Sequence, residues 1–188
     1  SRSTPGHHRE DHPGGILRRV MDGVVGHHAL HFVVIIAARV EVAHVLRDSG
    51  YGCNAFLGGI SVNYDTNFWN SDKNICVVEA DEYDRSFLKL NPDIAVISAM
   101  DADHLDIYGT AEAMENAFIE FSSRVRPNGL LLAKHGLKRE KDLKTLKHWT
   151  YCLHNKNANA FATNIRMMNG SYCFDMEIEK KVIKDVVL

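Results

Sequence analysis

Two short acidic segments carry the side chains best suited to chemistry in this chain. Residues 79–84 read Glu-Ala-Asp-Glu-Tyr-Asp, and residues 101–106 read Asp-Ala-Asp-His-Leu-Asp, which places the imidazole of His104 among carboxylates. Each segment follows an apolar run, at 74–78 and at 93–98, of the kind that forms a buried parallel strand. Ligands bind outside the carboxyl ends of such strands, and oxygen ligands suit Mg²⁺. The sequence therefore predicts a magnesium site where these two strands end.

The elements expected to position these segments form an α/β fold, with a mostly parallel sheet flanked by helices. One predicted helix covers 41–49 and ends at Gly50, and another covers 110–125 with Thr110 as its N-cap. The other predicted elements are a buried strand or core helix within 33–38, strands at 74–79, 93–98 and 130–133, a Lys-rich amphipathic helix at 137–147, a strand at 148–153, a hairpin turning at 168–170 and a strand at 182–188. The fold is thus expected to end in a small β-hairpin region.

Composition limits the classes of protein to which the chain can belong. Its 188 residues carry a net charge of −2 with mixed signs, which gives no sign of a nucleic-acid partner. The apolar run at 33–38 is too short to span a bilayer, which needs about 20 residues. The four cysteines are widely spaced and lack a Cys-x-x-Cys pattern, so we expect reduced thiols, and no signal peptide is evident. These features predict a cytoplasmic protein without a membrane partner.

Several motifs in a fixed order resemble the central domain of the Mur ligases. The resemblance extends from about residue 42 to residue 188 and is carried by the segments 43–50, 54–60, 79–88, 92–97 and 102–109. Because several motifs occur in the right order, the match is far more specific than any single motif. Within the family, the residues are most similar to the branch that joins L-alanine to UDP-N-acetylmuramate.

The resemblance implies an ATP-dependent amide ligase of peptidoglycan synthesis that works through an acyl phosphate, with ATP and Mg²⁺ as cofactors. Its substrates would be UDP-N-acetylmuramate and L-alanine. In this chain Glu79 and His104 would be the Mg²⁺ ligands. Two metal ions can bridge the transferring phosphoryl group and the attacking carboxylate, and phosphoryl transfer depends mainly on such positioning and charge neutralisation.

Further residues receive expected roles around these ligands. Asp103 and Asp106 would orient His104 or bound water, although either could instead cap the helix that follows. By resemblance, Gly58 and Gly59 form a loop near the substrate, for which a simple turn is the alternative. Ser86 is the third residue expected on the substrate side.

The chain departs from the family at its phosphate loop. A Mur ligase needs a glycine-rich loop that ends in Gly-Lys-Thr, just before the helix that includes Ala43. This chain has no such tripeptide and no lysine before Lys73. Residues 1–40 hold six of its eleven histidines and no lysine, asparagine or cysteine, whereas the rest is rich in lysine and asparagine. We therefore separate an atypical N-terminal segment, 1–40, from a partial central ATP-binding domain, 41–188; translation of 1–40 in a shifted reading frame is one hypothesis for the break.

Three alternatives to a fragment of the alanine-adding ligase stay open at this point. The first is a murein-peptide ligase of cell-wall recycling, which shares the Glu-Ala-Asp-Glu-Tyr-Asp motif. The second is a metal-dependent phosphohydrolase whose two-metal site would use Asp101, Asp103 and His104. The third is a non-catalytic domain that keeps the fold without a phosphate loop. In every case we expect the isolated chain to lack ligase activity.

Overall fold

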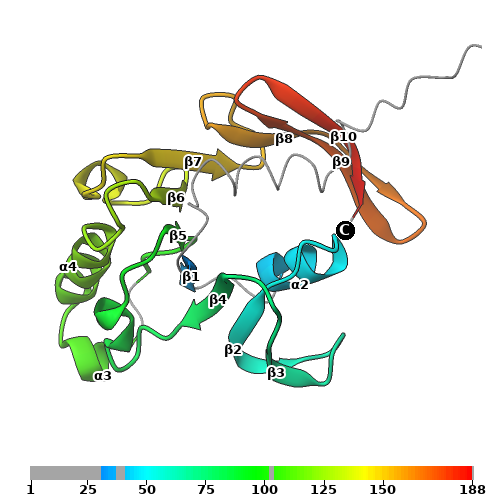
Figure 1. Ribbon diagram of the computed structural model, residues 1–188. Helices are drawn as coiled ribbons and strands as arrows, with labels where there is room; N and C mark the ends of the chain where they lie inside the picture. The colour runs from blue at the N-terminus through cyan, green and yellow to red at the C-terminus, as the bar shows by residue number, and fades with distance from the viewer. Residues whose placement is uncertain (1–30, 37–40, 102–103, 188) are drawn as a thin grey trace, which may run out of the picture.

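The described residues form one ten-stranded sheet with helices on both faces (Figure 1). The computed structural model describes residues 31–36, 41–101 and 104–187. The strand order is β10-β9-β8-β7-β6-β5-β1-β4-β2-β3. The strands are β1 His31–Ile36, β2 Asn54–Ser61, β3 Thr66–Trp69, β4 Ile75–Ala80, β5 Ile94–Ile97, β6 Leu130–Lys134, β7 His148–Cys152, β8 Ala160–Met168, β9 Ser171–Ile178 and β10 Lys181–Val187. The helices are α2 Glu41–Asp48, α3 Leu105–Tyr108, α4 Ala111–Ser122 and the 3₁₀ turns η1 Ser86–Lys89 and η2 Glu140–Asp142.

The centre of the sheet is parallel, as predicted, and β1 lies in its middle. β1 pairs with β4 on one side and with β5 on the other, and all three strands run in the same direction. Strand order therefore reverses at β1: the chain passes from β1 toward β2 on one side and later returns to β5 on the other. The carboxyl ends of β1, β4 and β5 meet at this switch point, which is where open α/β sheets bind ligands.

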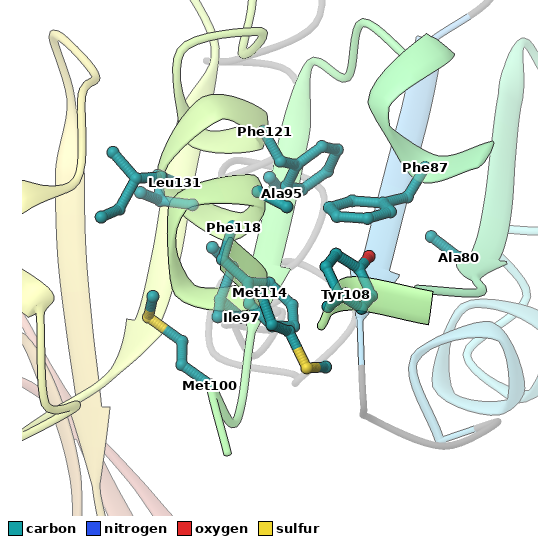
Figure 2. Packing of buried hydrophobic residues seen from close by; sticks show 12 residues of the cluster. Ala80, Phe87, Ala95, Ile97, Met100, Tyr108, Met114, Phe118, Phe121 and Leu131 are labelled. Carbon is teal, nitrogen blue, oxygen red and sulfur yellow. The ribbon is translucent and has the colours of Figure 1, made fainter. Parts of the chain in front are cut away.

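The two faces of the sheet are covered by different helices (Figure 1). α3, α4 and η1 pack on one face over the α4-side core, whose buried members include Ala80, Phe87, Ala95, Ile97, Tyr108, Met114, Phe118, Phe121 and Leu131 (Figure 2). α2 covers the other face over the α2-side core, which includes Val33, Ala43, Leu46, Ala55, Ile75, Val77, Ile94 and Val96. Side chains alternate between faces along β4 and β5, as a strand requires.

Most predicted elements agree with the observed ones, since their signals are local. The apolar run near 33 forms a strand, and Val33 is buried. The N-cap of α4 is Thr110, whose hydroxyl accepts a hydrogen bond from the Ala113 N–H at 3.1 Å. The hairpin at 168–170 turns through Asn169 and Gly170, both with positive φ, so a type I′ pair of residues joins β8 and β9.

The predicted helix at 137–147 is wrong. This stretch contains only the short turn η2, and long-range contacts fix the rest in an irregular path. Lys138 forms an ion pair of 2.7 Å with buried Glu115 of α4, and the Lys144 N–H donates to the buried Ser122 hydroxyl at 2.7 Å. The bond to Ser122 gives the Lys144 N–H a partner outside a helix, and the ion pair holds Lys138 against α4.

Gly58 and Gly59 do not form a loop. Both lie within β2, so that part of the prediction is wrong as well. The strand continues past its last pairing with β4, at Phe56 and Val78, and its carboxyl half therefore extends beside the end of β4. Gly58 brings a backbone without a side chain close to Glu79, which lies on β4.

Candidate functional site

Glu79 lies at the carboxyl end of β4, on the face that α2 covers. It pairs with Ile35, one residue before β1 ends, and Val77, two residues earlier on β4, is in the α2-side core. The Gly58 N–H donates to Oε2 of Glu79 at 3.0 Å. Because the ladder between β2 and β4 has already ended, this amide is free to bind the carboxylate. Among the contacts of the described residues, the second carboxylate oxygen has no protein partner and can accept a cation.

Residues 81–86, which follow β4, fold into two side-chain-capped turns. Asp81 accepts a hydrogen bond from the Tyr83 N–H, and Asp84 accepts one from the Ser86 N–H, each at 2.8 Å. The Ser86 hydroxyl and N–H, bound to the Asp84 carboxylate, hold the pKa of Asp84 below its ordinary value. The Ser86 hydroxyl oxygen also lies 3.5 Å from the Asp81 carbonyl oxygen. Ser86, Asp81 and Asp84 therefore shape the loop itself.

His104 lies after β5 and faces the loop that follows β4. Its backbone is in the left-handed region, with φ 54°, and it is the N-cap residue of α3. Its Nε2 lies 3.8 Å from Oε1 of Glu82, and its ring packs edge-on against Tyr83 with a centroid separation of 5.1 Å. The two acidic segments thus meet at one edge of the sheet, as the sequence predicts.

The expected neighbours of His104 are placed differently. Asp103 lies outside the described residues, and Asp101 is exposed. Asp106 is exposed within α3, where the structure gives its side chain no hydrogen bond or ion pair with a described residue. The carboxylate beside the imidazole is instead Glu82. Sequence reasoning assigned Glu82 no role, although it belongs to the acidic motif that was singled out.

The donor set at this edge suits a hard cation held mainly by water and phosphate. Within 31–36, 41–101 and 104–187, no three His, Cys, Asp or Glu side chains lie close enough together to hold a metal ion. Mg²⁺ requires only one or two protein groups when water and substrate complete its shell. Glu79, with one oxygen held by Gly58, and His104, beside Glu82, can supply such single ligands.

The connection from β1 to α2 does not fit the triphosphate of ATP. Only Ala37-Ala38-Arg39-Val40 separates Ile36 from Glu41, so the connection contains no glycine, lysine, serine or threonine. A phosphate loop needs glycine backbone N–H groups and a lysine at this place. Glu41 also puts a carboxylate in the first turn of α2, where its charge would repel a phosphate. The described residues therefore keep the carboxyl ends of β4 and β5 with Glu79, Glu82 and His104, here called the acidic edge, while the sequence between β1 and α2 has none of the residue types of a phosphate cradle.

Comparison with known proteins decides the family. The model of the Mur ligase middle domain matches residues 40–185, which include both acidic segments. The chain belongs to the Mur ligase family. Members of the family are ATP-dependent ligases.

Curated relatives in the family agree on one name. The chain is 43% identical over 145 residues to the UDP-N-acetylmuramate–L-alanine ligase of Flavobacterium johnsoniae, covering 77% of this chain and 30% of that protein. It is 46% identical over 149 residues to the ligase of the same name from Parabacteroides distasonis, covering 78% of this chain and 32% of the relative. The chain thus spans about a third of the length of the Mur ligases it matches.

Solved structures confirm the Mur ligase fold. The UDP-N-acetylmuramate-alanine ligase of Thermotoga maritima superposes with a TM-score of 0.65 at 20% identity, covering 92% of this chain and 39% of that one. A UDP-N-acetylmuramate:L-alanyl-gamma-D-glutamyl-meso-diaminopimelate ligase from Neisseria meningitides gives a TM-score of 0.65 at 20% identity, covering 87% and 56%. At these identities the structures show the fold, which both kinds of Mur ligase share.

Proposed function

We propose that this chain is part of a ligase that adds L-alanine to UDP-N-acetylmuramate in peptidoglycan synthesis. The observation that carries the proposal is the identity of 41–47% to several curated proteins that all bear this name. The matched region contains the acidic edge, so the similarity covers the residues with chemistry as well as the core. Under the same proposal the whole ligase acts in the cytoplasm. No helix in the described part of the chain is long and apolar enough to cross a membrane.

We further propose that Glu79 and His104 each bind Mg²⁺. Glu79 is suited to this because the Gly58 N–H fixes one oxygen at 3.0 Å and so orients the other. His104 is suited because the Glu82 carboxylate, 3.8 Å away, favours an oriented imidazole. A bound Mg²⁺ supplies charge neutralisation for a phosphoryl group. Asp103 and Asp106 stay in the proposal as residues around His104, and Gly58, Gly59 and Ser86 as residues on the substrate side.

The proposed division of the chain explains why the fragment should be inactive. Residues 41–188 would be a partial central domain, and residues 1–40 an atypical segment that nevertheless contributes β1 to the sheet. The sequence between β1 and α2 has no glycine and no lysine, and these residues make the main contacts to the phosphates of ATP in a phosphate loop. We expect the isolated chain to release no phosphate from ATP in the presence of UDP-N-acetylmuramate and L-alanine. A coupled phosphate-release assay measures this, and turnover above a blank without protein would contradict the expectation.

Metal binding tests the residue assignments directly. We expect the chain to bind Mn²⁺, used as a paramagnetic substitute for Mg²⁺, with broadening of NMR signals near the acidic edge. Glu79→Gln and His104→Asn should each weaken this binding by roughly a hundredfold or more, because each removes a direct ligand, and loss of a residue that only orients a ligand already costs about 10–100-fold. Asp72→Asn is the matched control, since the Asp72 side chain is 88% exposed and lies before β4. If the two variants bind Mn²⁺ like the parent chain, the assigned ligands are wrong.

The same titration with Mg-ATP, followed by calorimetry, separates this proposal from a non-catalytic domain. Saturable binding that both substitutions weaken would mean that other residues replace the missing phosphate loop. A folded chain that binds Mn²⁺ but not Mg-ATP would keep only the metal part of the site. A folded chain that binds neither would be the non-catalytic domain.

A further inference from the structure

We propose that Tyr108 is a positioning residue that joins the two acidic segments and sets the place of His104 at the sheet edge. The inference rests on the proposed role of His104 and goes beyond it, because Tyr108 touches neither a metal nor a substrate in this assignment. The Tyr108 hydroxyl donates to the backbone carbonyl of Glu82 at 2.5 Å, across 26 residues of chain. This bond connects the end of α3 to the loop that follows β4.

The Tyr108 side chain is held in one position by contacts on both sides of its ring. It is 5% exposed and belongs to the α4-side core, where Figure 2 shows its ring beside Phe87. The Arg85 guanidinium covers the ring, with its carbon 4.6 Å from the ring centroid. The ring is therefore held by the core on one side and by the loop after β4 on the other. A buried side chain with both contacts has little freedom to move.

The contacts close into a circuit that includes the imidazole. The Tyr108 N–H donates to the His104 carbonyl at 3.1 Å, while the Tyr108 hydroxyl holds Glu82. The Glu82 carboxylate lies 3.8 Å from Nε2 of His104. Tyr108 therefore binds the backbone of both residues whose side chains meet, His104 through its own N–H and Glu82 through its hydroxyl.

The backbone of His104 gives a reason for this bracing. A φ of 54° costs energy for a residue with a Cβ and persists only when neighbouring contacts enforce it. The first turn of α3 is one such contact, and the Tyr83 ring, perpendicular to the imidazole, is another. Tyr108 takes part in both contacts. It belongs to α3, and its hydroxyl binds Glu82, the residue that precedes Tyr83. Loss of its hydroxyl should therefore release the imidazole.

The test uses Tyr108→Phe, which keeps the ring in the core and removes only the hydroxyl. In the metal-free chain, we expect the ring proton signals of His104 to lose the shift caused by the Tyr83 ring and to move toward those of an exposed histidine. With Mn²⁺ as the probe, we expect roughly tenfold weaker binding, the lower range for residues that orient a ligand. Tyr172→Phe, an exposed tyrosine on β9, is the matched control and should change neither.

The two readouts separate this inference from the proposed function. If a folded Tyr108→Phe chain keeps the parent signals of His104, the inference is overturned. If the parent chain shows no Mn²⁺ broadening at His104, the metal role is wrong, while the metal-free spectra still decide on positioning. Should Tyr108→Phe fail to fold, Glu82→Gln tests the other link of the same set of contacts, because it keeps the backbone carbonyl that Tyr108 binds and removes only the charge 3.8 Å from His104. That variant should move the His104 signals, and unchanged signals would overturn the inference.

Discussion

At the scale of single residues, the site depends on which backbone groups lie beside the functional side chains. Glu79 differs from an ordinary carboxylate at the end of a strand because the Gly58 N–H binds one of its oxygens. A Cβ at Gly58 would lie 3.5 Å from the Glu79 carboxyl carbon, which is ordinary contact. Alanine would therefore fit there and partly cover the carboxylate. The absence of a side chain at Gly58 thus keeps the carboxylate open to water and cations.

Gly129 gives the sharpest stability prediction at this scale. A Cβ there would lie 2.5 Å from the Asp93 carbonyl oxygen and 2.8 Å from Val125 Cγ1, so Gly129→Ala must displace the backbone at the start of β5. We expect a loss of about 2 kcal/mol or more in the free energy of unfolding, measured by urea denaturation. The control is Gly59→Ala, because a Cβ at Gly59 meets nothing within 4 Å. Equal stability of the two variants would contradict the close packing at this turn.

At the scale of elements, contacts with α4 decide the path of residues 135–147. The Lys-rich, amphipathic sequence of 137–147 predicts a helix there, yet the segment packs against α4 along an irregular path. Glu115 on α4 is buried and pairs with Lys138 at 2.7 Å and with Arg139 at 3.7 Å. A buried carboxylate needs such partners, and a regular helix would direct the basic side chains along one exposed face instead.

A substitution at Ser122 tests whether contacts with α4 hold residues 135–147 in this path. Its fully buried hydroxyl donates to the Ile119 carbonyl at 2.6 Å and accepts from the Lys144 N–H at 2.7 Å. Ser122→Ala leaves that N–H without its partner, so we expect a loss of about 1–3 kcal/mol. Urea denaturation measures the loss, and faster hydrogen exchange at Lys144 locates it. Ser123→Ala, an exposed neighbour, should cost much less; similar losses for both would show that the bond to Lys144 is unimportant.

At the scale of the whole molecule, the sheet connects the acidic edge to regions far from it. Parallel pairing joins neighbouring strands from β2 through β4, β1, β5, β6 and β7 to β8, while β3 at one end and β9 and β10 at the other pair antiparallel. The chain spans about a third of the length of its curated relatives, so its own stability rests on this sheet and its two cores. A change of pH that weakens the packing of β7 should therefore lower the unfolding temperature of the whole chain.

His148, the first residue of β7, makes that stability depend on pH. Its Nε2 is buried without a hydrogen-bond partner in the described residues, and burial lowers the pKa of His148 below its ordinary value. Because the folded state favours the neutral ring, its contribution is complete above a pH of about 6.5, the unfolded value. As pH falls below that value, the unfolded state takes up the proton first and stability declines toward the folded pKa.

Thermal unfolding between neutral and mildly acidic pH measures this effect. We expect His148→Gln to flatten the decline, whatever its effect on stability at neutral pH. His154→Gln, at an exposed histidine, should leave the pH dependence unchanged. A parent chain whose stability is flat across this range would contradict a neutral buried His148.

The sequence predicted those elements whose signals are local. β4, β5 and α4 follow from apolar runs and from the cap at Thr110, and the hairpin follows from Asn169 and Gly170. The predictions that failed, at 137–147 and at 58–59, depend on neighbours distant in the chain. Charge patterning cannot reveal that Glu115 is buried. Likewise, a glycine pair looks like a turn until its strand is seen beside Glu79.

By itself, the sequence determined the family, the parallel sheet and the chemical types of the groups at its edge, because motif order and apolar periodicity are properties of neighbouring residues. It also established that residues 31–45 lack the glycines and the lysine of a phosphate loop. Only the tertiary structure decided that Gly58 holds Glu79 and that Tyr108 joins Glu82 to the end of α3. These bonds link residues 21 and 26 positions apart, and such contacts exist only once the sheet has brought distant segments together.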